Sequence, residues 1–169
     1  MKKFQTLMIF AILMVPCISP LNTLAQQEIE SQKSVDQKNE EMAVKSAVEN
    51  FLTALGNDET EKVKLMMLPN ANIGSIHMSD GESQIFTVTA DQYLSDREGK
   101  ENRKFKEPVS KYTVNISQGI LAFVRADATV YYDGVANYHT NDFFVLMKDN
   151  DTWKFLSASY TTLPLESDK

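Results

Sequence analysis

Residues 120–148 read ILAFVRADATVYYDGVANYHTNDFFVLMK, and this stretch decides the fold class. Its two halves, Ile120–Tyr132 and Val135–Lys148, are rich in the β-branched and aromatic residues typical of strands. Between them stands Asp133-Gly134, a dipeptide that favours the left-handed backbone of a two-residue hairpin turn. The pattern predicts two long antiparallel strands joined by a tight turn.

Further strands are expected on both sides of this hairpin. Val109–Ser117 alternates apolar and polar residues, and Gly119 turns the chain into the strand that follows. Asp149-Asn150-Asp151 is a polar turn, after which Trp153–Thr162 completes the antiparallel run.

The chain before Pro108 has the longer period of helices. Val44, Val48 and Phe51 recur at helical spacing, and Gly56-Asn57 predicts the end of this first helix. A polar side chain before the first turn, followed three residues later by Glu or Gln, is a typical helix start. Two such pairs predict a second and a short third helix: Asp58 with Glu61, and Thr89 with Gln92.

Helices followed by antiparallel strands indicate an α+β fold. We therefore expect three N-terminal helices packed on a curved, mainly antiparallel β-sheet, in one domain over residues 41–165. Residues 26–40 hold few large apolar side chains and are predicted to be a flexible tether.

The first 25 residues have the three parts of a secretory signal. Lys2 and Lys3 give a basic start, Leu7–Val15 is an apolar run, and small residues precede a cleavage position after Ala25. The run is too short for a membrane-spanning helix, which needs about 20 apolar residues. The sequence predicts a secreted or periplasmic protein with no membrane segment after cleavage. A lipid anchor on Cys17 is the alternative.

The net charge and the cysteine content argue against several classes of function. The 169 residues carry 17 Lys and Arg against 23 Asp and Glu, a net charge of −6. An acidic balance argues against a nucleic-acid partner. Cys17 is the only cysteine and lies within the predicted signal, so the mature chain has no thiol for a disulfide or a nucleophile.

Motifs for metal or cofactor chemistry are missing from the sequence. The two histidines, His77 and His139, are far apart, so no paired-histidine spacing is available for a metal. There is no phosphate loop, dinucleotide fingerprint or nucleophile elbow. We therefore expect no cofactor and no metal.

Three segments carry a resemblance to a known family. They are AVENFLTALGNDETEKVKLMMLPNANI (residues 47–73), TADQYL (89–94) and NDFFVLMKDNDTWKFLSASY (141–160). Their order resembles the nuclear transport factor 2-like superfamily, a cone-shaped fold shared by ketosteroid isomerase, SnoaL-type cyclases and lumazine-binding proteins. The short third helix and Trp153 after an acidic turn resemble the lumazine-binding group most. The resemblance covers about residues 41–163.

The resemblance implies where a catalytic set would lie, and the set is incomplete. Ketosteroid isomerase, a standard example of this chemistry, uses an Asp base with a Tyr and a protonated Asp that stabilise the oxyanion. The matching positions hold Phe51, Ser75 and Asp142, so only the protonated Asp has a counterpart. The sequence thus favours a domain without assembled catalytic machinery, although enzymatic activity stays open.

Two functional hypotheses follow, both placed in the interior of the cone. The first is a small-ligand-binding or dimerising interaction domain, with an apolar or aromatic ligand or a homodimer formed through the sheet face. The second is a hydrolase, dehydratase or cyclase that uses a His77–Asp142 acid/base pair. A pure scaffold, the third alternative, would have its interior filled by side chains. The predicted ligand pocket consists of Phe51, His77, Tyr93, Asp142, Phe144 and Tyr160.

Overall fold

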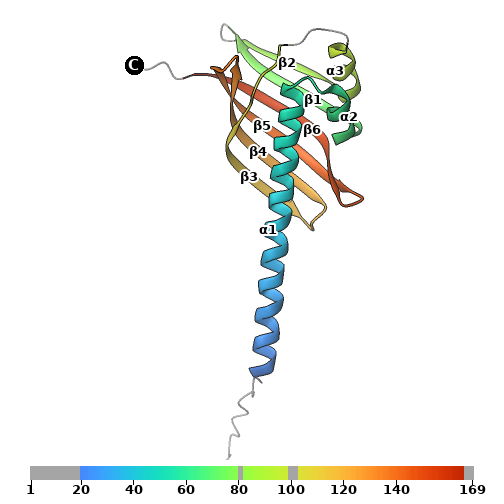
Figure 1. The fold of residues 1–169 in the computed structure, drawn as a ribbon, viewed down its shortest axis with the longest axis vertical. Helices are drawn as coiled ribbons and strands as arrows, with labels where there is room; N and C mark the ends of the chain where they lie inside the picture. Colours follow the sequence, from blue (N-terminus) through green and yellow to red (C-terminus); the bar gives the residue numbers. More distant parts are fainter. Residues whose placement is uncertain (1–19, 80–81, 99–102, 166–169) are drawn as a thin grey trace, which may run out of the picture. The chain divides into compact units, whose positions relative to one another are not determined.

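The computed structural model describes residues 20–79, 82–98 and 103–165 (Figure 1). The chain divides into two compact units, Met1–Val35 and Asp36–Lys169. Helix α1 (Pro20–Gly56) supplies all the described residues of the first unit and the beginning of the second. The signal-peptide prediction falls mostly on residues 1–19, outside the described residues, and stays a prediction.

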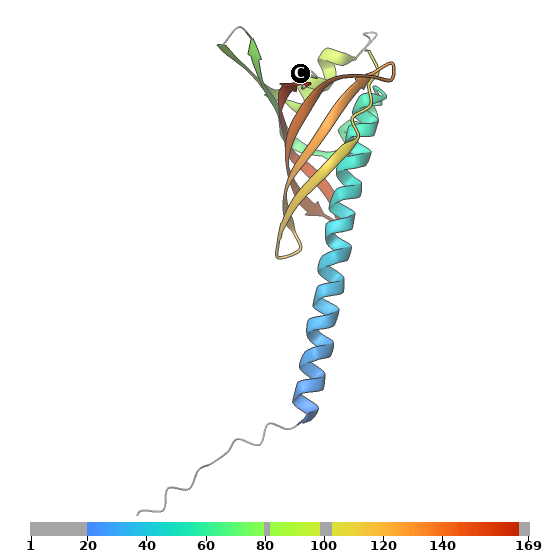
Figure 2. The same cartoon turned by 90° about the vertical axis from the view of Figure 1, so that its left-hand side faces the viewer.

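The second unit confirms the predicted α+β class. Two short helices, α2 (Thr60–Met66) and α3 (Ala90–Arg97), accompany α1 and a sheet of six strands. The strands are β1 (Met67–Ser79), β2 (Glu82–Thr89), β3 (Val109–Ser117), β4 (Leu121–Tyr132), β5 (Val135–Asp149) and β6 (Thr152–Pro164). Their order in the sheet is β2-β1-β6-β5-β4-β3, and every neighbouring pair is antiparallel except β1 with β6. Figures 1 and 2 show the resulting curved, twisted sheet.

The hairpin turns have the backbone that the sequence predicted. Asp133 and Gly134 take φ values of 53° and 81°, both left-handed. The turns between β3 and β4 and between β5 and β6 have the same feature, at Gln118-Gly119 and Asn150-Asp151. Left-handed residues match the twist of the flanking strands, which sets the register of each hairpin.

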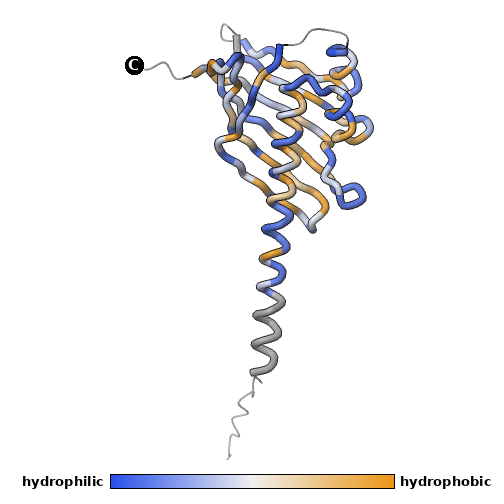
Figure 3. Tube along the Cα trace, viewed as in Figure 1, coloured by the Kyte–Doolittle hydropathy of each residue, from blue (hydrophilic) through white to orange (hydrophobic). Residues whose placement is uncertain are grey.

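The second half of α1 covers one face of the sheet with an apolar stripe. Val44, Val48 and Phe51 are at most 1% exposed. Phe51 stacks on Phe155 of β6 with ring centroids 4.3 Å apart and meets Phe144 of β5 edge-on at 6.0 Å. Figure 3 shows this half of the helix and the sheet rich in apolar residues, whereas residues 30–39 are mostly hydrophilic. Those residues are helical and exposed, and their role as a tether stays a prediction.

Glu40 ties the helix to the β5–β6 hairpin. Its two carboxylate oxygens accept hydrogen bonds from Lys148 Nζ at 2.6 Å and from Trp153 Nε1 at 3.2 Å. Both contacts are partly shielded from water, which makes this ion pair stronger than a surface pair. Contacts of the sheet domain are thus already present one residue before the predicted boundary at residue 41.

Two local predictions need correction. Asp58 does not cap α2, because it has a left-handed φ of 63° rather than the extended backbone of a cap, and its carboxylate binds Arg97 instead. Glu59 is the residue before the helix, and it makes no side-chain capping bond. The strands also do not all follow the helices, since β1 and β2 lie between α2 and α3. By contrast, the predicted cap of α3 is confirmed: Thr89 accepts a hydrogen bond from the Gln92 amide.

In the part of the chain that the structure describes, no helix has the length and apolar character needed to span a bilayer.

Gly56 is required where α1 ends. A Cβ at this position would lie 2.3 Å from the carbonyl oxygen of Phe105, whose amide donates to the Gly56 carbonyl at 3.0 Å. We predict that Gly56→Ala lowers the free energy of unfolding by about 1–3 kcal/mol, the usual cost of overpacking. Helix propensity alone would favour Ala by up to about 1 kcal/mol, so the sign of the change separates the two effects.

Urea unfolding followed by circular dichroism measures this change. Gly74→Ala is the matched control, because a Cβ there meets its nearest atoms at an ordinary 3.4 Å. Equal stabilities of the Gly56→Ala variant and the wild type would contradict the assigned close approach.

Candidate functional site

The interior of the domain holds a partly enclosed cavity of about 190 Å³. It lies between α1, α3, the sheet and the segment around Phe105. Much of its wall is aromatic, contributed by Phe51, Tyr93, Phe105, Tyr132, Tyr138, Phe144 and Tyr160. Its charged lining residues are Arg97, Glu107 and Asp142. A dry cavity of about 150 Å³ holds benzene, so this one has room for a ring compound.

The structure brings together most of the residues that the sequence predicted for the pocket. Five of the six line this cavity: Phe51, Tyr93, Asp142, Phe144 and Tyr160. His77 is the exception, since it does not belong to the lining. Whether the five bind a ligand stays a prediction.

His77 is held on the sheet by hydroxyl groups. Its ring nitrogens lie 3.0 Å from Thr162 Oγ1 and 3.1 Å from Ser75 Oγ, and its ring meets that of Tyr160 edge-on at 5.7 Å. Among the hydrogen bonds of the described residues, none joins His77 to Asp142. The register explains this separation, because Tyr160 lies between Ser75 on one side and Asp142 on the other. The structure therefore does not bring the considered acid/base pair into contact.

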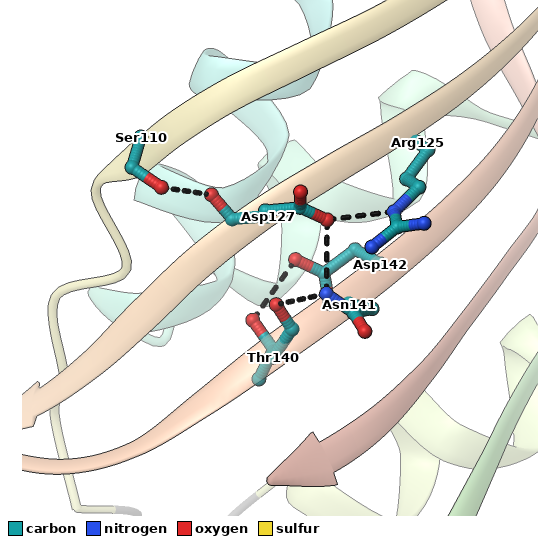
Figure 4. A network of polar contacts seen from close by, with 6 residues as sticks. All are labelled: Ser110, Arg125, Asp127, Thr140, Asn141 and Asp142. Atoms are coloured by element: carbon teal, nitrogen blue, oxygen red, sulfur yellow. Dashed lines mark hydrogen bonds and ion pairs between the residues drawn. The ribbon is translucent and has the colours of Figure 1, made fainter. Parts of the chain in front are cut away.

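Asp142 points into the domain. Alternation along β5 buries Thr140, Asp142 and Phe144 on the inner face and leaves Phe143 47% exposed on the outer one. Asp142 itself is only 4% exposed. Figure 4 shows it joined to Thr140, whereas Asn141, between them in the sequence, joins Asp127 and thereby Arg125.

A second carboxyl faces the same point. Thr140 Oγ1 lies 2.8 Å from Glu107 Oε1 and 3.2 Å from Asp142 Oδ2. A hydroxyl carries one proton and can donate it to only one of the two carboxyls. The other contact becomes a hydrogen bond when that carboxyl is protonated and donates to the hydroxyl oxygen. The arrangement is thus complete when Glu107 and Asp142 together hold one proton.

The electrostatics agree with this geometry. Burial, and after it the nearby Glu107 carboxylate, raise the pKa of Asp142 from its ordinary 3.8 to about 8, against the opposing effect of the Thr140 hydrogen bond. Burial also raises the pKa of Glu107. Near neutral pH the buried pair therefore keeps a proton that isolated carboxyls would have lost.

Phenol groups line the same cavity as the carboxyl pair. Burial raises the pKa of Tyr138 and that of Tyr160, so both phenols remain protonated and can donate hydrogen bonds. On α3, the Tyr93 hydroxyl accepts from Arg97 Nη1 at 3.4 Å. The same guanidinium donates to Asp58 Oδ1 from Nε at 3.1 Å and from Nη2 at 2.6 Å. The positive charge at the cavity wall is therefore already paired with a carboxylate.

Glu107 also borders a wider groove. This groove has a volume of about 750 Å³ and shares Leu52, Phe105 and Glu107 with the lining of the cavity. The segment that carries Phe105 and Glu107 is held by two backbone bonds between Lys106 and Tyr131, at 3.0 and 2.8 Å. Glu107 thus stands between open solvent and the enclosed carboxyl.

The sequence pointed to neither Glu107 nor Arg97. Glu107 lies outside any helix or strand, where no periodicity indicates which way a side chain points. Arg97 lies in the last turn of a short helix, where a basic residue ordinarily needs no partner beyond the helix end. In the described residues, no three His, Cys, Asp or Glu side chains gather as a metal site would require.

The raised pKa of Asp142 makes stability depend on pH. A carboxyl that binds its proton more tightly in the folded chain stabilises the fold fully below its unfolded pKa of about 4, and this stabilisation is lost as pH rises toward 8. We predict that Asp142→Asn, which keeps a neutral group, removes this loss. Between pH 4 and 8 the free energy of unfolding of the variant therefore rises relative to that of the wild type, by an amount on the order of a few kcal/mol.

Urea unfolding at a series of pH values checks this prediction. Asp133→Asn is the matched control, since the Asp133 side chain is 84% exposed at the hairpin turn. A constant difference between wild type and Asp142→Asn across the pH range would contradict the protonated state.

Comparisons with known proteins agree with this architecture. The model of the family described as "putative lumazine-binding" matches residues 39–161. No curated protein matches the chain. Among solved structures, a "putative scytalone dehydratase" from Novosphingobium aromaticivorans has a TM-score of 0.61 at 17% identity, covering 80% of this chain and 99% of that one.

Two further structures show the same fold. A nuclear transport factor 2-like protein with a cystatin-like fold, also from Novosphingobium aromaticivorans, has a TM-score of 0.60 at 9% identity, with 90% and 94% of the two chains covered. A "putative dehydratase" of the same superfamily from Streptomyces avermitilis has a TM-score of 0.56 at 14% identity, with 77% and 99% covered. The chain therefore has the fold of these nuclear transport factor 2-like structures and belongs to the "putative lumazine-binding" family.

Proposed function

We propose that this protein is an exported receptor for a small planar ring compound, which binds in the cavity. The observation that carries the proposal is the cavity itself, about 190 Å³ with aromatic walls and a polar end formed by Glu107, Thr140 and Asp142. Binding sites for small molecules typically combine apolar walls with a few convergent polar groups. The family description names lumazine, a ring compound of this kind.

We do not extend the dehydratase activity named for two of the solved structures to this chain. Their identity with it is 17% and 14%. The pair considered for such chemistry, His77 with Asp142, makes no mutual hydrogen bond, because His77 contacts Ser75 and Thr162. Export rests on the basic start, the apolar run and the small residues Thr23 and Ala25 before the predicted cleavage position.

Native mass spectrometry of the protein purified from its own host's cell envelope tests this proposal. We predict a reproducible added mass that denaturation releases, on a chain that begins at Gln26. Val130→Phe, which places a larger side chain in the cavity wall, is expected to lose the added mass.

Val135→Phe is the matched control, because Val135 is 68% exposed on the neighbouring strand. It should keep the added mass, and melting curves show whether both variants fold. A wild-type protein without added mass would contradict the receptor, and an uncleaved N-terminus would contradict export.

We also propose that the domain forms a homodimer through the outer face of the sheet. Phe123 on β4 and Phe143 on β5 are 51% and 47% exposed there, and they border a shallow groove. Arg125 and Asp127 lie on the same face and form an ion pair at 2.7 Å. A face that is apolar and carries both charges can be complementary to itself across a twofold axis.

Light scattering after size exclusion tests the dimer. We predict twice the chain mass for the wild type and a single chain mass for Phe143→Glu. Val135→Glu, at the exposed first position of β5, should leave the dimer intact. A wild-type monomer, or a Phe143→Glu variant that still dimerises, would contradict this interface.

A further inference from the structure

The polar end of the cavity carries two carboxyl groups, and the positive side chain in the cavity lining makes hydrogen bonds to other residues. Glu107 and Asp142 contact the same Thr140 hydroxyl, at 2.8 and 3.2 Å. The cation in the lining, Arg97, donates its hydrogen bonds to Asp58 and Tyr93. Two carboxyls that lie this close in a shielded site stay together by retaining a proton or by gaining a cation.

The walls suit a cation as well. The faces of aromatic rings attract positive charge, and the attraction is strongest where water is excluded. Rings from four elements line the cavity that holds the carboxyl pair: Phe51 on α1, Tyr93 on α3, Phe144 on β5 and Tyr160 on β6. The phenol oxygens of Tyr138 and Tyr160 can also accept hydrogen bonds from N–H donors.

We propose that the cavity recognises a small aromatic cation, an amidinium or ammonium group carried on one ring, whose charge replaces the proton held between Glu107 and Asp142. This inference rests on the proposed receptor function and specifies its ligand class. On binding, the carboxyl O–H bond breaks, the proton leaves to solvent, and the two carboxylates pair with the N–H donors of the ligand. Cation binding is therefore coupled to proton release.

The groups that titrate or carry charge around the pair come from every neighbouring element. They are Glu49 on α1, Tyr93 and Arg97 on α3, His77 on β1, Tyr112 on β3, Asp127 and Tyr132 on β4, Tyr138 on β5 and Tyr160 on β6. The phenols of Tyr112, Tyr138 and Tyr160 have raised pKa values and stay neutral near pH 7. The exchangeable proton is therefore the one shared by Glu107 and Asp142.

Three isosteric probes separate charge from shape: benzamidinium, benzamide and benzoate. Titration calorimetry of the full mature protein is run at pH 7 in two buffers that differ in ionisation enthalpy, which yields the number of protons released. We predict that benzamidinium binds at least about tenfold more tightly than benzamide and that benzoate binds most weakly. Benzamidinium binding should release close to one proton and tighten between pH 6 and 8.

Variants assign the effect to the carboxyl pair. Asp142→Asn should lose at least about tenfold in benzamidinium affinity and keep its affinity for benzamide. Glu107→Gln should reduce the proton release, because Asp142 then ionises without a neighbouring carboxylate. Asp133→Asn, an exposed carboxylate far along the hairpin, is the control and should change neither quantity. Melting curves confirm that each variant folds.

The outcomes separate this inference from the receptor proposal. Equal affinities for benzamidinium and benzamide, tighter binding of benzoate, or binding without proton release would overturn the cation assignment and leave the receptor standing. Absence of saturable benzamidinium binding would also overturn it. A wild-type protein without a retained ligand mass would instead contradict the receptor.

Discussion

The packing of Phe51, on α1, against the sheet is the contact on which the rest of the domain depends. Phe51 is 1% exposed and stacks on Phe155 while meeting Phe144 edge-on. These rings hold the helix over the inner face of the sheet, and Glu40 fastens the preceding turns to Lys148 and Trp153. The cavity begins where this packing stops, so Phe51 serves both the core and the cavity wall.

A cavity in this position needs polar groups that survive burial. Asp142 is nearly inaccessible to water, and an isolated carboxylate there would be costly. The free-energy penalty of burial is reduced because Thr140 bridges Asp142 to Glu107 and the two carboxyls retain a proton. The polar end of the cavity is thereby stable without a ligand and still able to exchange its proton. This property connects the fold to the proposed binding function.

The sequence predicted the structure correctly where the residue pattern within one helix or hairpin decides its conformation. The strands around Asp133-Gly134 and the stripe of Val44, Val48 and Phe51 follow from local periodicity and turn chemistry. Alternation placed Asp142 and Phe144 on the same side of β5, and the structure decided that this side is the buried one. The resemblance matched Phe51 and Asp142 to positions of a catalytic set, and both residues line the cavity. It also suggested that His77 pairs with Asp142. In the structure, strand β6 lies between β1, which carries His77, and β5, which carries Asp142.

The sequence by itself determined the α+β class and the strands and turn of the β4–β5 hairpin, because these depend on contacts within a few residues or between adjacent strands. Only the tertiary structure decided that Glu107 meets Thr140, that Asp58 meets Arg97 rather than capping α2, and that β1 runs parallel to β6. These contacts join residues 33, 39 and more than 80 positions apart. No local pattern encodes such distances, since the closure of the whole sheet around α1 brings the partners together.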